Sequence, residues 1–256
     1  MNVDLISYTP NILEVIYRAA RTCYSAMTPR DMWNKVLREN LSEEELKGKM
    51  TFLIDKVLGS CHESIAEHAY FTFAVEGIDR ATLAQITRHR TGIAFSVQSQ
   101  RYVEIKESKK DLVKLLDNYD QAEIYTLVDK YFVVDREDHA LQHTCLMSLI
   151  NYRDLIENHG KKAEDARAVL PNCTKTNMII SMNLREFMHI CNLRLCTKAQ
   201  LPIRQMVQAM VKEVVKVEPA ISKYLVPKCV SIGYCNESDS CGRVKVTKED
   251  LLRLQK

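Results

Sequence analysis

Three consecutive basic residues are the part of this chain best suited to chemistry on a charged ligand. Arg88, His89 and Arg90 are followed after eight residues by Ser99, and Arg101 comes two positions later. Arginine offers paired N–H donors to phosphate, and a serine hydroxyl can bond the edge of a pyrimidine ring. The spacing predicts a surface that binds a ligand carrying both groups. For the three basic residues alone, the alternative is a solvated helix end favoured by the helix dipole.

The glycines exclude the common phosphate-binding loops. None of the seven lies in a GxGxxG or a GxxxxGK[ST] pattern. Both patterns need glycine so that backbone amides can approach a phosphate. A nucleotide would therefore have to be held by side-chain cations and hydroxyls.

The composition is that of an ordinary globular protein, with 46% hydrophobic and 27% charged residues. A net charge of +3 is too small to indicate binding to nucleic acid or to a membrane. No apolar run approaches the length that spans a bilayer, and the first residues form no basic-then-apolar leader. Nine cysteines, an odd number, predict reduced thiols in a cytoplasmic protein.

The elements that must position the basic residues follow from hydrophobic periodicity. Residues 3–8 are expected to form a strand and residues 12–19 part of a helix. The capping-box spacing that begins at Ser42 predicts a helix to about residue 59. Aromatic and β-branched residues at 70–75 predict another strand.

A helix is expected to lead directly into the basic residues. Gly77 should end the preceding strand, and Asp79 can cap a helix that runs to Arg90. Gln85 would then lie one turn before His89 and share a helical face with it. A strand-like segment follows.

The remaining pattern is mostly helical. Residues 105–165 are charged and helical in spacing, residues 178–181 are typical of a strand, and residues 183–195 and 201–217 are typical of helices. A few strands with long helices predict an α+β (layered α/β) fold, a single domain with a mixed sheet flanked by long helices.

The complete basic motif, Arg-His-Arg followed after eight residues by Ser-x-Arg, resembles the signature of flavin-dependent thymidylate synthases, the ThyX family. Four further blocks resemble other elements of that family and occur in the same order: residues 18–24, 62–68, 166–171 and 183–200. The blocks follow the family's order over residues 18–204, and this shared order is more specific evidence for the resemblance than any one block.

The resemblance implies a ThyX-like catalytic domain at residues 1–225, followed by a cysteine-containing tail at 226–256. It implies conversion of dUMP to dTMP, with methylenetetrahydrofolate as carbon donor, NADPH as reductant and FAD as hydride carrier. It further implies a homotetramer with shared active sites, and no nucleic-acid or membrane partner.

The resemblance also implies the roles of individual residues. The expected dUMP contacts are Gln85, Arg88, Ser99, Arg101, Arg167 and Arg194. The expected flavin contacts are Cys23, His62, Arg88, His89, Arg90, Asn183, Arg185 and His189. Of these residues, Arg194, Ser99 and His62 are expected to lie closest to the chemistry.

In this family the mechanism is thought to need no protein nucleophile, so Ser99 is expected to bind the substrate and not to attack it. Two residues depart from the family pattern. Val97 stands where many members carry an acidic residue, and His189 stands where others often have asparagine. The departure at Val97 bears on how the loop that contains Ser99 contacts the folate or dUMP.

Other chemical sites are less well supported. Cys173 is better explained as a small buried residue than as a nucleophile, because no histidine follows it as a local base. His62 and His68 are six residues apart, whereas the zinc hydrolase motif needs histidines four apart.

Three cysteines in the tail, Cys229, Cys235 and Cys241, could ligate a metal. Structural zinc sites usually use CxxC pairs and four ligands, and no fourth cysteine is close in sequence. We therefore expect free thiols and no metal site.

Two other functions are left open by the sequence. A nucleic-acid-binding protein would need further basic residues interleaved with aromatic ones, and the near-balanced charge does not supply them. A catalytically inactive relative that only binds nucleotide would not need all the arginines that are present.

Overall fold

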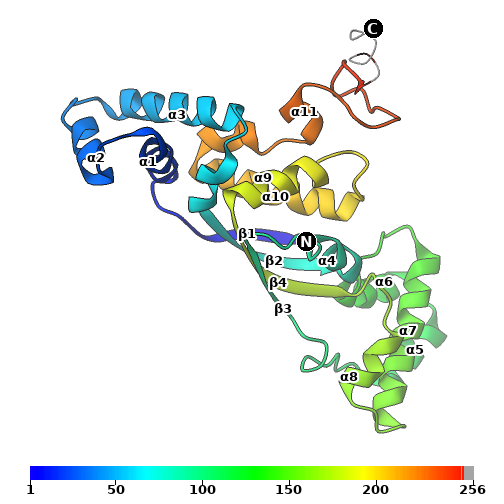
Figure 1. Ribbon diagram of the computed structural model, residues 1–256. Coiled ribbons are helices and arrows are strands. Elements are labelled where there is room, and N and C mark those ends of the chain that lie inside the picture. Colours follow the sequence, from blue (N-terminus) through cyan, green and yellow to red (C-terminus); the bar gives the residue numbers. More distant parts are fainter. Residues whose placement is uncertain (249, 251–256) are drawn as a thin grey trace. The chain divides into compact units, whose positions relative to one another are not determined.

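The computed structural model describes residues 1–248 and 250 (Figure 1). It contains one four-stranded sheet with the strand order β1-β2-β4-β3. The strands are β1 (Asn2–Tyr8), β2 (Tyr70–Asp79), β3 (Ile93–Val97) and β4 (Lys175–Asn183).

Neighbouring strands of the sheet run in opposite directions. The backbone N–H of Asn183 donates to Gly92 at one end of the β3–β4 pair, and that of Gln98 donates to Asn177 at the other. The β2–β4 pair has the same arrangement, with Leu184 bonded to Ala69 and Arg80 bonded to Thr174, while Thr9 bonds Tyr70 between β1 and β2. The expected α+β class with long helices is confirmed, and the sheet is antiparallel where a mixed one was expected.

The chain divides into two compact units, and every strand contains residues of both. The first unit comprises Met1–Asn2, Val75–Arg88 and Ser96–Ile179. The second comprises Val3–Ala74, His89–Phe95 and Ile180–Lys256.

The second unit contains most of the predicted long helices. Its helices are α1 (Ile12–Tyr24), α2 (Pro29–Leu37), α3 (Glu43–Gly59), η1 (Glu63–His68), α9 (Leu184–Arg194), α10 (Leu201–Val217), η3 (Pro219–Tyr224) and α11 (Lys228–Ile232). The predicted capping box is present, because Ser42 accepts from the Glu45 N–H and the Glu45 carboxylate accepts from the Ser42 N–H. α9 packs against η1, α10 and α11.

The first unit contains the short helices α4 (Arg80–Ile86) and η2 (Arg167–Val169). It also contains the helices of the charged segment, coloured green in Figure 1: α5 (Lys109–Asn118), α6 (Gln121–Tyr131), α7 (His139–Glu157) and α8 (Ala163–Ala166). α5 and α6 pack on α7 around a core that includes Val128, Phe132 and Leu146, all fully buried. The segment therefore has a hydrophobic core of its own.

Two sequence expectations around the basic motif are wrong. β2 continues through Gly77 to Asp79, because glycine tolerates the positive φ of 67° that the strand takes there. α4 ends at Ile86, where Thr87 bonds the Leu83 carbonyl through both its N–H and its hydroxyl. Arg88 and the two residues after it thus follow the helix, and Gln85 cannot share a helical face with His89.

Among the described helices, none has both the length and the apolar character needed to cross a bilayer.

Candidate active site

His89, in the second unit, lies at the centre of a buried hydrogen-bond network. Its Nδ1 is 2.9 Å from Oε1 of Glu186, and its Nε2 accepts a hydrogen bond of 3.2 Å from Nε of Arg194. Because a guanidinium can only donate, Nε2 must be the unprotonated nitrogen, and the Nδ1–H donates to Glu186. His89 is only 6% exposed.

The electrostatics agree with a neutral imidazole. Burial lowers the pKa of His89 to about 4, with smaller contributions from Arg194 and His189. Burial also raises the pKa of the Glu186 carboxyl and lowers that of Arg194. At neutral pH the imidazole therefore acts as an acceptor toward Arg194.

The start of α9 positions this network. Asn183 caps the helix by accepting the Glu186 N–H at 2.8 Å, and its own N–H donates to the Gly92 carbonyl at 3.0 Å. Gly92 has a φ of 65°, and a Cβ built there would overlap the Asn183 side chain, with the Asn183 Cγ only 2.9 Å away. Position 92 therefore requires glycine, because the Asn183 side chain that caps α9 lies too close to leave room for a Cβ.

The block at residues 62–68 contributes through its acidic residues. Glu67 and Glu63 of η1 both pair with Arg185 of α9, and Arg185 Nε lies 3.5 Å from Glu63 Oε2. These pairs raise the pKa of the Arg185 guanidinium, with the Glu67 hydrogen bond as the main cause. His62 is exposed at the start of the same short helix.

A metal could be considered at His89, Glu186 and His189, whose ligand atoms lie within 4.8 Å of one another. Both ring nitrogens of His89 already have hydrogen-bond partners, and one partner is the Arg194 guanidinium. A cation in this position would be repelled by that guanidinium. The geometry therefore favours a hydrogen-bond network.

A second group of predicted residues is brought together in the first unit. Glu164 joins two arginines, because its carboxylate accepts from Arg101 Nε at 2.8 Å and its carbonyl accepts from Arg167 Nε at 3.0 Å. Ser99 Oγ accepts the Arg101 N–H at 3.2 Å. Arg80 is also close to Arg167, since that charge adds to burial in lowering the pKa of Arg80.

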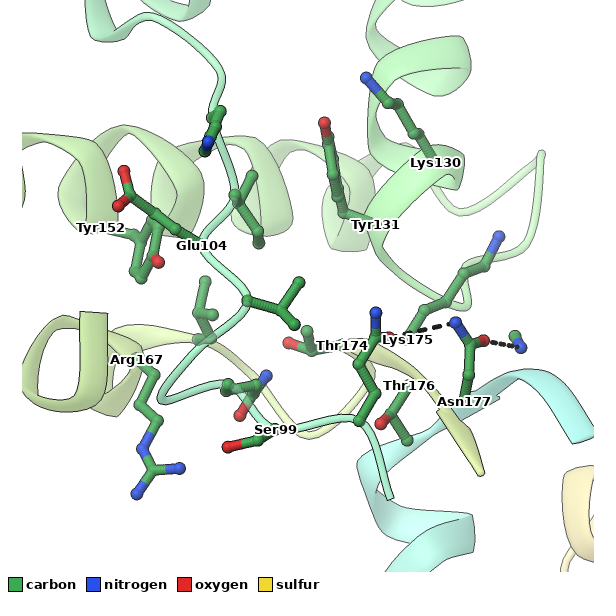
Figure 2. A pocket seen from close by; sticks show the side chains of 17 residues that line it. Ser99, Glu104, Lys130, Tyr131, Tyr152, Arg167, Thr174, Lys175, Thr176 and Asn177 are labelled. Carbon is green, nitrogen blue, oxygen red and sulfur yellow. Dashed lines mark hydrogen bonds between the residues drawn. The ribbon is translucent and has the colours of Figure 1, made fainter. Parts of the chain in front are cut away.

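A cavity of about 520 Å³ in the first unit adjoins this group. Figure 2 shows Ser99 and Arg167 at one side of the cavity and Lys130 and Tyr131 at the opposite side. The Thr176 hydroxyl lines it and is buried with no hydrogen-bond partner among the described residues. The cavity can therefore accept a polar, anionic ligand of nucleotide or cofactor size.

Several residues of this cavity escaped the sequence analysis. Lys130 is held by Glu107 at 2.7 Å, and Lys175 is held by Asp129 at 3.1 Å. In the sequence these lysines are ordinary members of a charged segment. Only the fold places them in the wall of one cavity.

The predicted site residues divide between the units. Of the expected flavin residues, Cys23, His62, His89, Arg90, Asn183, Arg185 and His189 belong to the second unit and Arg88 to the first. Of the expected dUMP residues, Gln85, Arg88, Ser99, Arg101 and Arg167 belong to the first unit and Arg194 to the second. The structure brings together His89, Asn183, His189 and Arg194 in one group and Ser99, Arg101 and Arg167 in the other.

Other predicted residues lie outside these networks. Cys23 is exposed near the end of α1 and bonds the Ala19 carbonyl, while Arg88 and Arg90 are exposed. Cys173 contacts the sulfur of buried Cys145 at 3.5 Å, in keeping with its interpretation as a packed residue.

Comparison with known proteins decides the family. Residues 4–220 match the model described as thymidylate synthase complementing protein. The flavin-dependent thymidylate synthase of Clostridium tetani is 33% identical, covering 97% of this chain and 96% of the relative. That of Pyrococcus furiosus is 35% identical, covering 93% of this chain and 91% of the relative.

The chain belongs to the family of flavin-dependent thymidylate synthases.

Among solved structures, thymidylate synthase X of Helicobacter pylori, determined with FAD and dUMP, superposes with a TM-score of 0.66 at 24% identity. The match covers 90% of this chain and 99% of that one. At this identity the likeness shows the shared fold. The membership confirms the predicted family and enzyme class, a flavin-dependent thymidylate synthase, while the roles of individual residues stay predictions.

Proposed function

We propose that this chain converts dUMP to dTMP, with methylenetetrahydrofolate as the carbon donor and NADPH-reduced FAD as the hydride carrier. One contact carries the proposal at the level of residues. His89, expected to touch the flavin, accepts a hydrogen bond from Arg194, expected to touch dUMP. This contact supports a site in which a residue expected to bind the flavin and one expected to bind dUMP are direct neighbours within the second unit.

The residues of the second unit fit a flavin carrying phosphates. Arg90, Arg185 and His189 are exposed donors beside the buried His89 and Asn183. Guanidinium groups can hold phosphate oxygens, and polar side chains can orient a ring. FAD, when bound, supplies hydride transfer, while the protein orients the reactants and excludes competing reactions.

The first unit supplies groups that fit the nucleotide substrate. Arg101 and Arg167 are fixed by Glu164, and Ser99 accepts the Arg101 N–H, which leaves its own hydroxyl proton to donate to a ligand. A guanidinium beside the pyrimidine would stabilise negative charge that develops on the ring. These contacts support a binding role for Ser99.

The proposal includes a homotetramer with shared active sites, placed in the cytoplasm, with no nucleic-acid or membrane partner. Large apolar side chains on β1 and at the start of β2 remain accessible, with Ile6 55%, Tyr8 44% and Tyr70 48% exposed. Exposed apolar groups of this size on a sheet favour burial against another subunit. Light scattering during gel filtration tests the tetramer, and a monomeric active enzyme would contradict it.

The absorbance spectrum of the purified protein is the first test of the proposed activity. We expect a flavin spectrum and dTMP formation that requires dUMP, methylenetetrahydrofolate and NADPH together. A colourless protein that neither takes up added FAD nor forms dTMP would refute the proposal. A protein that binds FAD and dUMP without turnover would instead identify an inactive relative.

A further inference from the structure

Four cysteines gather around one small cavity of the second unit. Cys229, Cys235 and Cys241 come from the C-terminal segment, and Cys196 comes from the turn between α9 and α10. All four line a cavity of about 130 Å³. Cys196 is thus the fourth cysteine whose apparent absence argued against a metal site in the sequence.

The described part of the C-terminal segment, residues 226–248, is bonded to the turn that carries Cys196. Arg243 donates to the Leu195 carbonyl at 3.1 Å, and Lys198 pairs with Asp239 at 2.7 Å. Cys235 forms a bridge to Thr247, with its N–H donating to the Val246 carbonyl at 2.8 Å. These bonds hold the segment in place independently of any bound ion.

We propose that Cys196, Cys229, Cys235 and Cys241 form a structural zinc site that clamps the C-terminal segment onto the turn after α9. Four thiolates in tetrahedral arrangement are a common ligand set of structural zinc. Zinc suits the site better than a hard cation, because sulfur ligands select soft or borderline metals. The family model ends at residue 220, so three of the four ligands lie beyond the region it describes.

Zinc binds cysteine as the thiolate, so loading the site would release the thiol protons.

The sulfurs must draw closer together when the metal binds. Of the residues that the structure describes, only His89, Glu186 and His189 place three ligand atoms within 4.8 Å of one another. Tightening is feasible, because Cys196 and the segment around Cys241 lie in irregular backbone. Zinc binding should therefore order this segment further.

The first experiment measures metal in untagged, full-length protein purified with a reductant that does not bind zinc. Elemental analysis should find about one zinc per chain. After removal of the metal, cobalt should produce thiolate-to-cobalt absorption and the bands of a tetrahedral ion. Zinc-free protein that takes up neither metal would overturn the proposal.

Alkylation of the unmodified chain identifies the ligands without substitutions. With zinc bound, Cys196, Cys229 and Cys241 should react slowly, and removal of the metal should make all three react faster, as mass spectra would show. Cys235 is buried and should react slowly in both states, and exposed Cys61 should react equally in both. Equal labelling of Cys196, Cys229 and Cys241 with and without zinc would contradict the assignment.

Two variants complete the test. Cys196→Ser and Cys235→Ser should each lose stoichiometric zinc, whereas Cys61→Ser should keep it. If Cys196→Ser binds zinc as tightly as the unmodified chain, the proposal that zinc joins the turn after α9 to the C-terminal segment is wrong. Metal content and alkylation are read without flavin or substrate, so failure here is distinct from failure of the proposed activity.

Discussion

Arg194 donates a hydrogen bond of 3.2 Å from Nε to Nε2 of His89, a residue 105 positions earlier in the chain. The contact assigns the protonation of the imidazole, because its other nitrogen must then donate to Glu186. A buried, neutral histidine thus orients an arginine expected to bind the substrate. Three of the predictions below follow from this pair and its supports.

The first prediction concerns pH. The pKa of His89 is lowered to about 4 from its ordinary value of 6.5, so the unfolded chain binds the proton more readily. The folded state is therefore stabilised relative to the unfolded chain by keeping His89 neutral. This stabilisation is fully present above pH 6.5 and is lost as the pH falls toward 4. NMR titration of the His89 ring nitrogens should show a neutral imidazole at pH 6. Titration near pH 6.5 would contradict the buried network.

The second prediction concerns the support of His89. Glu186→Ala leaves the buried Nδ1–H without its acceptor, which should cost about 1–3 kcal/mol of unfolding free energy. It should also lower kcat, because Arg194 loses its oriented partner. Glu186→Gln keeps an acceptor oxygen and should restore most of both losses. Urea denaturation and steady-state kinetics measure the effects, with exposed Glu44→Ala as control.

If Glu186→Ala and Glu186→Gln lowered kcat equally, the negative charge would matter, and the proposed hydrogen-bond role would be wrong.

The third prediction concerns the glycine after the basic motif. Gly92→Ala combines a strained φ of 65° with overlap of the Asn183 side chain. Gly160→Ala is a matched control, since its φ is 62° and its added Cβ meets nothing within 4 Å. The control should cost about 1 kcal/mol. Gly92→Ala should cost more and reduce the FAD retained on purification, as absorbance would show.

If Gly92→Ala and Gly160→Ala lowered the free energy of unfolding equally, the Asn183 side chain would have to move aside at no energetic cost, and the close contact would not explain the glycine.

The fourth prediction concerns substrate binding. Arg101→Ala removes an expected charge-assisted phosphate contact and should cost about 1.5–3 kcal/mol of dUMP binding, roughly 10- to 150-fold in Kd. Its pair with Glu164 is half exposed, so the loss of that pair should change stability little. Calorimetric titration with dUMP measures the effect, and Arg30→Ala on α2 provides the control. Unchanged affinity would remove Arg101 from the substrate site.

Local structure was predictable where short-range chemistry decides it. The capping box at Ser42 and the helix at Leu201–Val217 were identified because capping and apolar spacing act within a few residues. The end of α4 was misplaced by four residues. The sequence offers no proline or glycine at that point, and Thr87 ends the helix through bonds to its own preceding turn.

The sequence by itself determined the family and the identity of the basic residues, because order and spacing along the chain are one-dimensional properties. The tertiary structure decided which side chains support them. Glu186, Glu164 and Cys196 carry no local sequence pattern, and each gains its role by contact with a segment far away in the chain. A buried carboxylate or a fourth cysteine can act only after folding has brought its partner within bonding distance. The spacing of residues along the chain does not give that distance.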